Sequence, residues 1–477
     1  MILQDIPFIT PQIIVVATAI ILLIANSFKK IITVNYIISQ IFLILACIVE
    51  LLLAFKPQGT FFDGTMLYSY HVHLVQGFMF FSLFLIFLYA KNCIQQLDKY
   101  NLEFYVLLLL STVGATTSVS ANNFIVLYIG IELMSLSIYS LIILSSSKSE
   151  HTVSCIATMN YFIFNVVSTC FLLYGLSFIY GVTGSLDFVN INMSSDISSV
   201  VLNSKIYLFS LTLVVLSLMV KLGVSPFHFW VYDLYSASSK YLIVFISTIP
   251  KLTYLMILFN FFFSCEFNSK EFIVSILNVC AVISILFGSI SAFSQKSFKK
   301  LLAYSSISHT GFILLCFNLS NERLLPTFLL YSIHYLLVMI AFWGILILLS
   351  SKTNSRVENI SQISGLYYSS PWISFLFLVL IGAMLGLPPF SGFVTKVVLI
   401  INLIHEESYY IAFFSSSMTL FSSLYLIRIV KSLFVKKSLC KDSISINETR
   451  SFLYITIHCM FFLFLGIYPK FLTTVLS

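Results

Sequence analysis

Four charged side chains lie within long apolar stretches of the sequence. They are Glu132 in FIVLYIGIELMSLSIYSLIIL, Lys221 after LFSLTLVVLSLMV, Lys251 in YLIVFISTIPKLTYLMILF and Lys396 in FSGFVTKVVLIINLI. A charge at the centre of a membrane helix costs on the order of 2.5–3.5 kcal/mol on insertion scales, so such residues are functional candidates. A lysine in an apolar setting releases its proton more readily than in water, and a nearby carboxylate stabilises the protonated form again. The four residues predict a proton relay; the alternative for Glu132 with Lys221 is a static ion pair that fixes helix packing.

Other titratable residues are weaker candidates for the same relay. His334 lies inside an apolar stretch, whereas His228 and His309 are expected at helix ends in polar surroundings. A hydrogen-bonded histidine with a structural role is the alternative for each of the three, although relay histidines are common in pumps. Asp233 is a candidate because of its position in the repeat described below. Glu50 is expected at the outer end of its span, with its carboxyl group in reach of interfacial water.

The sequence contains no familiar device for binding a metal, nucleotide or redox cofactor. Its nine cysteines are scattered, without a C-x-x-C pair or a His/Cys cluster at ligand spacing. That pattern argues against disulfide frameworks, structural zinc and Cys-ligated iron–sulfur centres. G-x-G-x-x-G, Walker and C-x-x-C-H motifs are also missing from the sequence. We therefore expect no cofactor in this chain, and ion movement is its expected chemistry.

The elements that position these residues must be membrane helices. Of the 477 residues, 59% are hydrophobic and 9% are charged, whereas about 25% of the residues in soluble domains are charged. The mean hydropathy is +1.02, so the apolar excess must face lipid. The first ten residues resemble neither a transit peptide nor a cleavable signal, so the first span is expected to be retained. The many Lys, Phe and Tyr residues are typical of an AT-rich genome, such as that of an organelle.

Apolar runs of about 20 residues predict about fourteen spans. Two half-length runs, 226–239 and 391–404, follow the seventh and twelfth spans. Sixteen Lys and Arg residues lie in the loops after odd-numbered spans and five in the opposite loops. This bias predicts that both termini lie outside and that the odd-numbered loops lie inside. The longest polar loops are expected at 181–204 and 431–451.

A short element occurs twice, 163 residues apart, as LGVSPF at 222–227 and LGLPPF at 385–390. Each copy ends one apolar run and begins a half-length run, so its proline should break a helix within the membrane. Broken helices at matching positions indicate a transport site between two repeats. An odd number of spans in each repeat would give the two repeats opposite orientations. In the repeat register, Asp233 and Lys396 occupy equivalent positions; chance recurrence in a Leu- and Phe-rich chain is the alternative.

These segments resemble the antiporter-like membrane subunits of respiratory complex I. The resemblance is carried by the following segments, in the expected order: IGIELMSLSIY (129–139), KLGVSPFHFWVYDLY (221–235), PKLTYL (250–255), KKLLAYSSISHTGF (299–312) and GLPPFSGFVTK (386–396). It extends from about 100 to 430 and is greatest to the subfamily of mitochondrial NADH dehydrogenase subunit 2 and bacterial subunit N. The family fold implies an all-α polytopic membrane protein with fourteen spans, two inverted five-helix repeats and broken seventh and twelfth helices.

The resemblance also implies roles and partners. Glu132, Lys221, Lys251 and Lys396 match the family's relay glutamate and lysines, and a lysine at the last position separates this subfamily from the subunit 4-like members. The implied activity is proton translocation driven by quinone reduction elsewhere in NADH:ubiquinone reductase. NADH, flavin, iron–sulfur clusters and ubiquinone are expected in other subunits. The expected partners are other complex I subunits and lipids, with no nucleic acid.

Three points stay open in the sequence. A subunit of a multi-protein Na⁺/H⁺ antiporter shares the fold and is the alternative function, although Lys396 and the codon bias favour complex I. A non-pumping scaffold is a third possibility, disfavoured because the line of ionisable residues is intact. The expected location is the mitochondrial inner membrane, with the bacterial plasma membrane as the alternative. The expected division is an N-terminal segment, two repeats and a C-terminal segment, at 1–99, 100–265, 266–435 and 436–477.

Overall fold

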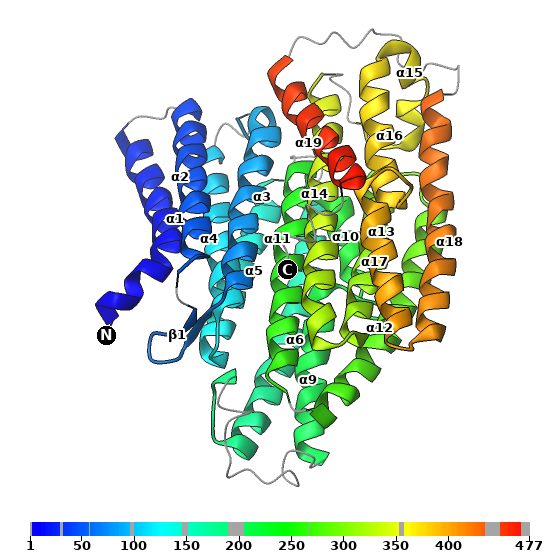
Figure 1. Ribbon diagram of the computed structural model, residues 1–477. Coiled ribbons are helices and arrows are strands. Elements are labelled where there is room, and N and C mark those ends of the chain that lie inside the picture. Colours follow the sequence, from blue (N-terminus) through cyan, green and yellow to red (C-terminus); the bar gives the residue numbers. More distant parts are fainter. Residues whose placement is uncertain are drawn as a thin grey trace. The chain divides into compact units, whose positions relative to one another are not determined.

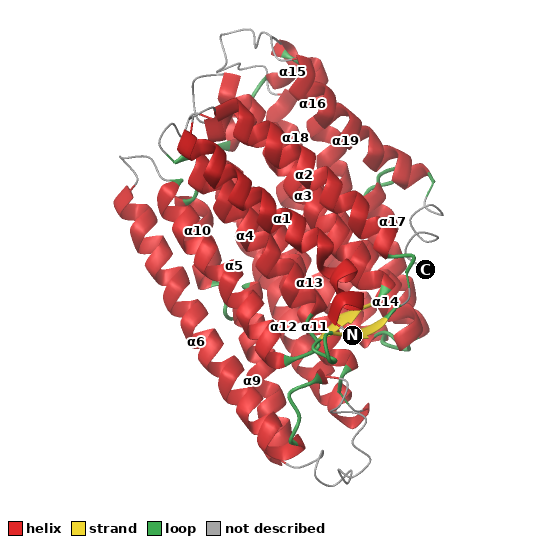
Figure 2. Ribbon diagram, turned by 90° about the vertical axis from the view of Figure 1, so that its left-hand side faces the viewer, coloured by secondary structure: helices red, strands yellow, loops and turns green. Residues whose placement is uncertain are grey.

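The computed structural model describes residues 2–28, 32–56, 58–95, 100–145, 151–188, 205–265, 267–352, 357–434 and 449–468. Most of these residues are helical, and the only strands among them form one short hairpin (Figures 1 and 2). The chain divides into two compact units. The first contains Met1–Gly223 and Ala237–Ser275, and the second contains Val224–Ser236 and Ile276–Ser477. Each unit is described below by itself.

The first unit is a bundle of long helices around α11. Its elements are α1 (Ile2–Phe28), α2 (Ile32–Leu53), β1 (Gly59–Phe61), β2 (Met66–Tyr68), α3 (Tyr70–Gln95), α4 (Asn101–Ser120), α5 (Phe124–Leu144), α6 (His151–Thr183), α9 (Lys205–Leu222) and α11 (Lys240–Phe263). Helix α11 packs on α3, α4, α5 and α9, while α1 and α2 pack with α3 and α4. The closest approach joins α4 to α5, where a Cβ atom on Gly114 would lie 2.7 Å from the carbonyl oxygen of Gly130.

The second unit contains the following elements: α10 (Phe229–Ala237), most of α12 (Phe267–Ser294), α13 (Phe298–Leu314), η1 (Leu315–Asn318), α14 (Asn321–Lys352), η2 (Ile360–Ile363), α15 (Leu366–Ser369), α16 (Pro371–Leu385), α17 (Ser391–His405), α18 (Tyr409–Phe434) and α19 (Thr449–Ile467). Helix α14 packs on α13, α16, α17 and α19. Most side chains along α14 are buried, which makes it the core helix of this unit.

Both predicted helix breaks are present and have the same backbone geometry. Helix α9 ends at Leu222 and α16 ends at Leu385, and the glycine that follows each has a positive φ, 67° at Gly223 and 77° at Gly386. Glycine adopts this region without the steric cost of a side chain. In both copies the Phe amide then donates to the carbonyl three residues back, to Val224 in one and Leu387 in the other. The sequence repeat is therefore also a structural repeat.

Twelve helices in the described part of the chain are long and apolar enough to cross a membrane. The seventh of these, α9, is continued beyond its break by α10. Together with α19 and with the broken helix formed by α16 and α17, they make fourteen spans. The expected fold class, an all-α polytopic membrane protein with two broken helices, is confirmed. The four-part division of the chain stays a prediction.

Local structure departs from the expectation in two places. Helix α1 begins at Ile2 rather than near residue 11 and contains Pro7 and Pro11. Pro11 has no amide hydrogen for the Pro7 carbonyl, which instead accepts from the Thr10 hydroxyl at 2.7 Å. The hairpin of β1 and β2, with Gly59 opposite Tyr68, was not expected between the second and third spans. Much of the two long loops, at 189–204 and 435–448, lies outside the described residues.

Candidate functional site

The site in the first unit begins with Glu132 on α5. This helix begins after Asn123, whose side chain accepts a hydrogen bond from the amide of Ile125. Glu132 lies about two turns further along and is half-buried in the isolated chain. Ser135, three residues on and therefore on the same face, donates to Glu132 Oε2 at 3.3 Å. One carboxyl oxygen is thus held by its own helix, and the other faces a neighbouring helix.

Thr169 on α6 connects Glu132 to Lys221. Its hydroxyl is 3.0 Å from Glu132 Oε1 and accepts from Lys221 Nζ at 3.1 Å. Asn165, one turn earlier on α6, accepts from Lys221 Nζ through its side-chain oxygen, also at 3.1 Å. Because both bonds share the Thr169 oxygen, the carboxylate and the ammonium are two hydrogen bonds apart. The structure therefore brings together the predicted pair through an intervening hydroxyl rather than as a direct ion pair.

Lys221 also faces α11. It lies in the last turn of α9 with 4% of its surface exposed, and its Nζ lies 6.0 Å from the centre of the Tyr254 ring. Lys251 lies three residues before Tyr254 on α11, on the same face, and is equally buried. The first unit therefore contains a sequence of polar groups from Glu132 through Thr169 and Lys221 to the face of α11 that carries Lys251.

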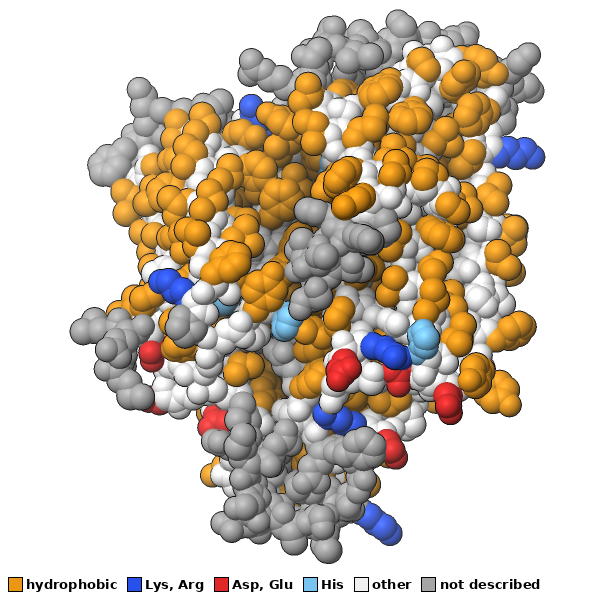
Figure 3. Space-filling view, viewed as in Figure 1, with side chains coloured by type: hydrophobic (Ala, Val, Ile, Leu, Met, Phe, Trp, Pro, Cys, Tyr) orange, Lys and Arg blue, Asp and Glu red, His pale blue; other side chains and the backbone are white. Residues whose placement is uncertain are grey.

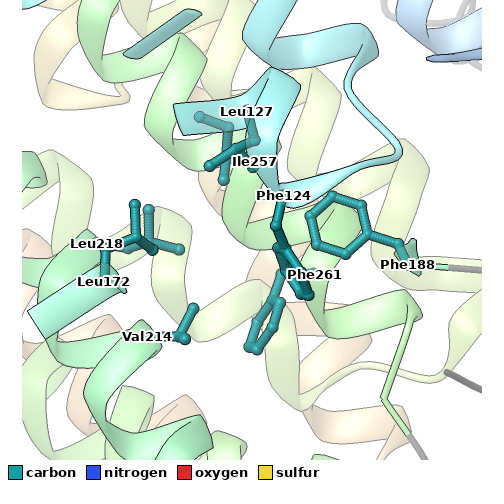
Figure 4. A pocket seen from close by; sticks show the side chains of 8 residues that line it. All are labelled: Phe124, Leu127, Leu172, Phe188, Val214, Leu218, Ile257 and Phe261. Carbon is teal, nitrogen blue, oxygen red and sulfur yellow. The ribbon is translucent and has the colours of Figure 1, made fainter. Parts of the chain in front are cut away.

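An apolar pocket lies about one helical turn along α6 and α9 from this polar cluster. Figure 4 shows the side chains that line it. Leu172 follows Thr169 by three residues on α6, and Leu218 precedes Lys221 by three residues on α9. The other lining residues come from α5, α9, α11 and the segment after α6: Phe124, Leu127, Phe188, Val214, Ile257 and Phe261. None of these side chains can donate or accept a hydrogen bond, so this side of the cluster offers no partner to a proton.

The second unit places Lys396 at its helix break. Lys396 Nζ donates to the carbonyl oxygens of Met384 at 3.2 Å and Leu385 at 2.9 Å, in the last turn of α16. These carbonyls have lost their helical partners because the helix ends there, and a helix C-terminus favours a positive charge. The two freed carbonyls therefore supply acceptors for the Lys396 ammonium. The side chain is 6% exposed and its Nζ lies 5.8 Å from the centre of the Phe312 ring.

Two histidines lie in the same unit. His334 on α14 bonds through Nδ1 to the hydroxyl of Ser391 at 3.3 Å, in the first turn of α17. His309 bonds through Nδ1 to the Tyr331 hydroxyl at 3.2 Å. The sequence had suggested a helix end for His309, but it lies inside α13. His334 therefore lies beside the break that holds Lys396, and His309 connects α13 to α14.

Asp233 and His228 flank the first break. Asp233 lies on α10, and its repeat equivalent Lys396 lies on α17, so both occupy the half-helix that follows a break. His228 bonds through Nδ1 to the hydroxyl of Ser225 at 3.1 Å, and its ring lies 4.2 Å from that of Phe287. These contacts fit a histidine that fixes the break. The roles of all the predicted relay residues stay predictions.

The expectation for Glu50 is wrong. Its side chain is 0% exposed, and Glu50 Oε1 lies 2.9 Å from Nδ1 of His73 on α3. Helices α2 and α3 pack closely there, and the hairpin lies at that end of both, so the carboxyl group does not reach an open surface of the chain. His73, three residues after the start of α3, was not singled out in the sequence.

Sequence reasoning also missed Thr169 and Asn165. The cost of burying charge identifies ionised side chains, whereas a neutral hydroxyl or amide is common in membrane helices. The available signal was their spacing, because residues four apart lie on one helix face. That signal is weak without a known partner on another helix.

A polytopic helical protein with two broken helices and a buried carboxylate–hydroxyl–lysine cluster belongs to the class of antiporter-like membrane proteins. The family described as NADH:quinone oxidoreductase/Mrp antiporter, TM, matches residues 121–422, and the chain belongs to this family. Subunit N of NADH-quinone oxidoreductase from Francisella tularensis subsp. holarctica is 29% identical over 98% of this chain and 97% of its own. The subunit N from Thioalkalivibrio sulfidiphilus is 32% identical over 85% and 83%.

The fold of this chain is similar to that of one chain in a solved respiratory complex. A chain of respiratory complex I from Thermus thermophilus aligns with a TM-score of 0.80 and 21% identity, over 97% of this chain and 98% of that one. At this identity the likeness concerns the fold.

Proposed function

We propose that this chain is the N subunit of an NADH-quinone oxidoreductase and that it translocates protons across the membrane. The observation that carries this proposal is the chain of contacts from Glu132 through Thr169 to Lys221. A hydroxyl that accepts from an ammonium and donates to a carboxylate can pass a proton by exchanging its own. The names of the relatives support membership in that complex, with NADH and quinone chemistry in other subunits.

The relay operates between two states of the pair. With Glu132 ionised, the ammonium of Lys221 is favoured by the nearby negative charge. When the carboxyl group moves away, Lys221 loses that stabilisation in a buried setting and releases its proton towards Tyr254 and Lys251. Lys396, at the C-terminus of α16, is the corresponding proton carrier of the second unit. No redox step is assigned to this chain.

The bacterial plasma membrane is the proposed location, since the relatives named above are bacterial. A mitochondrial inner membrane is the alternative that the amino-acid bias had suggested. The alternative function, a subunit of a Na⁺/H⁺ antiporter, shares the family description. It predicts that proton movement requires sodium, whereas the proposed function predicts that it requires NADH and quinone.

The test uses inside-out membrane vesicles that contain the whole complex. NADH oxidation and proton uptake into the vesicles are measured together, with and without sodium. We expect Glu132→Gln and Lys221→Met to lower proton uptake per NADH by about tenfold, because positioned acid–base groups contribute at least that much. Glu103→Gln, an exposed carboxylate in the first turn of α4, is the matched control. Unchanged pumping in both relay variants, or pumping that depends on sodium, would overturn the proposal.

A further inference from the structure

A second buried acid–base pair lies in the first unit, on helices that the relay does not use. Glu50 on α2 and His73 on α3 are 0% and 2% exposed, and Glu50 Oε1 lies 2.9 Å from His73 Nδ1. The ion pair of Arg323 with Glu406 in the second unit has both side chains partly exposed. The Glu50–His73 pair is thus the more deeply buried of the two.

Aromatic side chains cover the pair at the hairpin end of α2 and α3. The ring of Tyr68, on β2, stacks on His73 at 5.0 Å, and Phe8 of α1 lies 6.1 Å from the same imidazole. Phe61 of β1 packs in turn on Phe8 at 3.9 Å. The hairpin therefore forms a cover over an acid–base pair that lies about one helical turn inside the end of the bundle.

The titratable groups that face the pair remain neutral. Burial raises the pKa of the Tyr68 phenol well above its ordinary value, and the Glu50 carboxylate raises that pKa further. Cys47 lies one turn before Glu50 on α2, and its thiol bonds to the Gly77 carbonyl at 3.6 Å. On α1 the Phe8 ring lies against His73, and on α4 the hydroxyl of Ser120 bonds to the Tyr68 phenol. Neither Tyr68 nor Cys47 competes for the proton of the pair at neutral pH.

The other carboxyl oxygen lacks a hydrogen-bond partner in the part of the chain that the structure describes. Glu50 Oε2 is buried and makes no hydrogen bond among the described residues. An ionised oxygen that is buried without a donor is costly, and a proton bound there removes the charge. With one proton shared between Oε1 and Nδ1 and one on Nε2 of the imidazole, the pair has no net charge. A further proton at Oε2 neutralises the carboxylate and leaves one positive charge on the imidazolium. A pair that served packing alone would not require an acceptor that faces no donor.

We propose that Glu50 and His73 form a second proton-binding site of this chain, separate from the Glu132–Lys221 relay, in which one proton is shared across the pair and a second binds reversibly at Glu50 Oε2. Uptake converts the carboxylate into a carboxylic acid beside an imidazolium, and release reverses that step without any other change in bonding. A hydrogen-bonded pair of amides, Gln12 with Gln76 at 3.3 Å, lies one turn further along α3, where Gln76 Nε2 also donates to the Thr116 carbonyl. Only the biological role of this site rests on the proposed function. Proton binding at the site is measured independently of pumping.

The direct test is infrared difference spectroscopy of the purified, intact complex between acidic and neutral pH. Spectra of the wild type minus those of Glu50→Gln should contain one carboxylic acid band that titrates with pH. Glu50→Asp should retain a band at a shifted frequency, and His73→Gln should move its midpoint by about one pH unit or more, because a neighbouring positive charge is lost. Identical spectra for the wild type and Glu50→Gln would overturn the proposal.

Two controls separate this inference from the proposed function and from misfolding. Glu132→Gln should leave the Glu50 band in place, whatever its effect on pumping, so that failure of one proposal is distinct from failure of the other. Gln at position 50 can still bond to a neutral His73, so assembly should persist. Should Glu50→Gln nevertheless fail to assemble, the wild type minus Glu50→Asp spectrum decides, and the absence of a shifted band there would reject the site.

Discussion

At the scale of single residues, the relay depends on a hydroxyl group as much as on charges. Thr169 has one proton to donate, and both Glu132 Oε1 and the Asn165 carbonyl lie within 3.0 Å of its oxygen. It can therefore turn between two acceptors while it accepts from Lys221. Such a group transmits a proton only if both neighbours remain in contact with it, which makes it a sensitive position for mutation.

Replacing Thr169 by Val should separate Glu132 from Lys221 without changing side-chain volume greatly. A hydrogen bond to a charged group contributes about 1.5–3 kcal/mol, so we expect proton pumping per NADH to fall by about tenfold or more. Thr169→Ser retains the hydroxyl and should pump at close to the wild-type rate. Measurement in inside-out vesicles distinguishes the two. Equal pumping by the Val and Ser variants would show that the hydroxyl is not part of the path.

Lys396 allows a test of titration against charge. Lys396→Met removes the charge and leaves the Met384 and Leu385 carbonyls without their donor, whereas Lys396→Arg retains a charge that does not lose its proton. We expect both variants to assemble and to oxidise NADH while pumping falls. If the Arg variant pumps normally, Lys396 is an electrostatic residue and not a proton carrier, and if both fail only in assembly, it is structural.

At the scale of helices, the second break depends on a close approach between α16 and α17. A Cβ atom on Gly392 would overlap the carbonyl oxygen of Ala383, and it would lie 3.2 Å from Nε2 of His334. Both neighbours belong to the region that holds Lys396. The absence of a side chain at this one position lets the first turn of α17 pack against the last turns of α16, and so sets the geometry of the site.

Gly392→Ala should therefore disturb the break. The added methyl group meets backbone rather than the flexible end of a side chain, so the helices must move, and we expect a lower melting temperature of the complex together with reduced pumping. Gly181→Ala is the matched control, because Gly181 lies in the helix α6 with no atom within 4 Å of the added Cβ. Alanine there should stabilise slightly, by about 0.5–1 kcal/mol. Equal melting temperatures for the two variants would contradict this account.

At the scale of the whole molecule, large apolar side chains are exposed on the helices, and many lie on the face seen in Figure 3. On α18, Tyr410 is 93% exposed and Phe413 is 77% exposed. Surfaces of this kind are stable only against lipid or another membrane subunit. Orientation across the membrane is then set by the basic residues in the loops, since they resist translocation.

The distribution of basic residues predicts the sidedness of individual loops. The turn between α12 and α13, at Gln295, should lie inside, and the turn between η1 and α14, at Ser320, should lie outside. Alkaline phosphatase joined after Ser320 should be active, because the enzyme forms its disulfides only outside, and the same reporter after Gln295 should be inactive. A fluorescent protein that folds inside should give the opposite pattern. Reversed reporters would mean that the chain is inserted the other way.

The sequence by itself determined the class of the protein and the location of its breaks. Hydropathy identifies the spans because it is summed over consecutive residues of the chain. L-G-x-x-P-F identifies the breaks because glycine and proline change the conformation and hydrogen bonding of the backbone at their own positions. The same holds for Glu132, Lys221, Lys251 and Lys396, whose burial follows from their neighbours in the chain. These are local properties, and local properties can be read without a fold.

Only the tertiary structure decided which polar groups meet. Thr169 is neutral and stands 37 residues from Glu132 and 52 from Lys221, so its role as a bridge depends on how α5, α6 and α9 pack. Glu50 looked like an interfacial residue because it lies near a helix end, and its burial required the hairpin and His73 on the next helix. A hydrogen bond between helices is fixed to a few tenths of an ångström by packing, and a sequence pattern fixes a side chain only to a helix face.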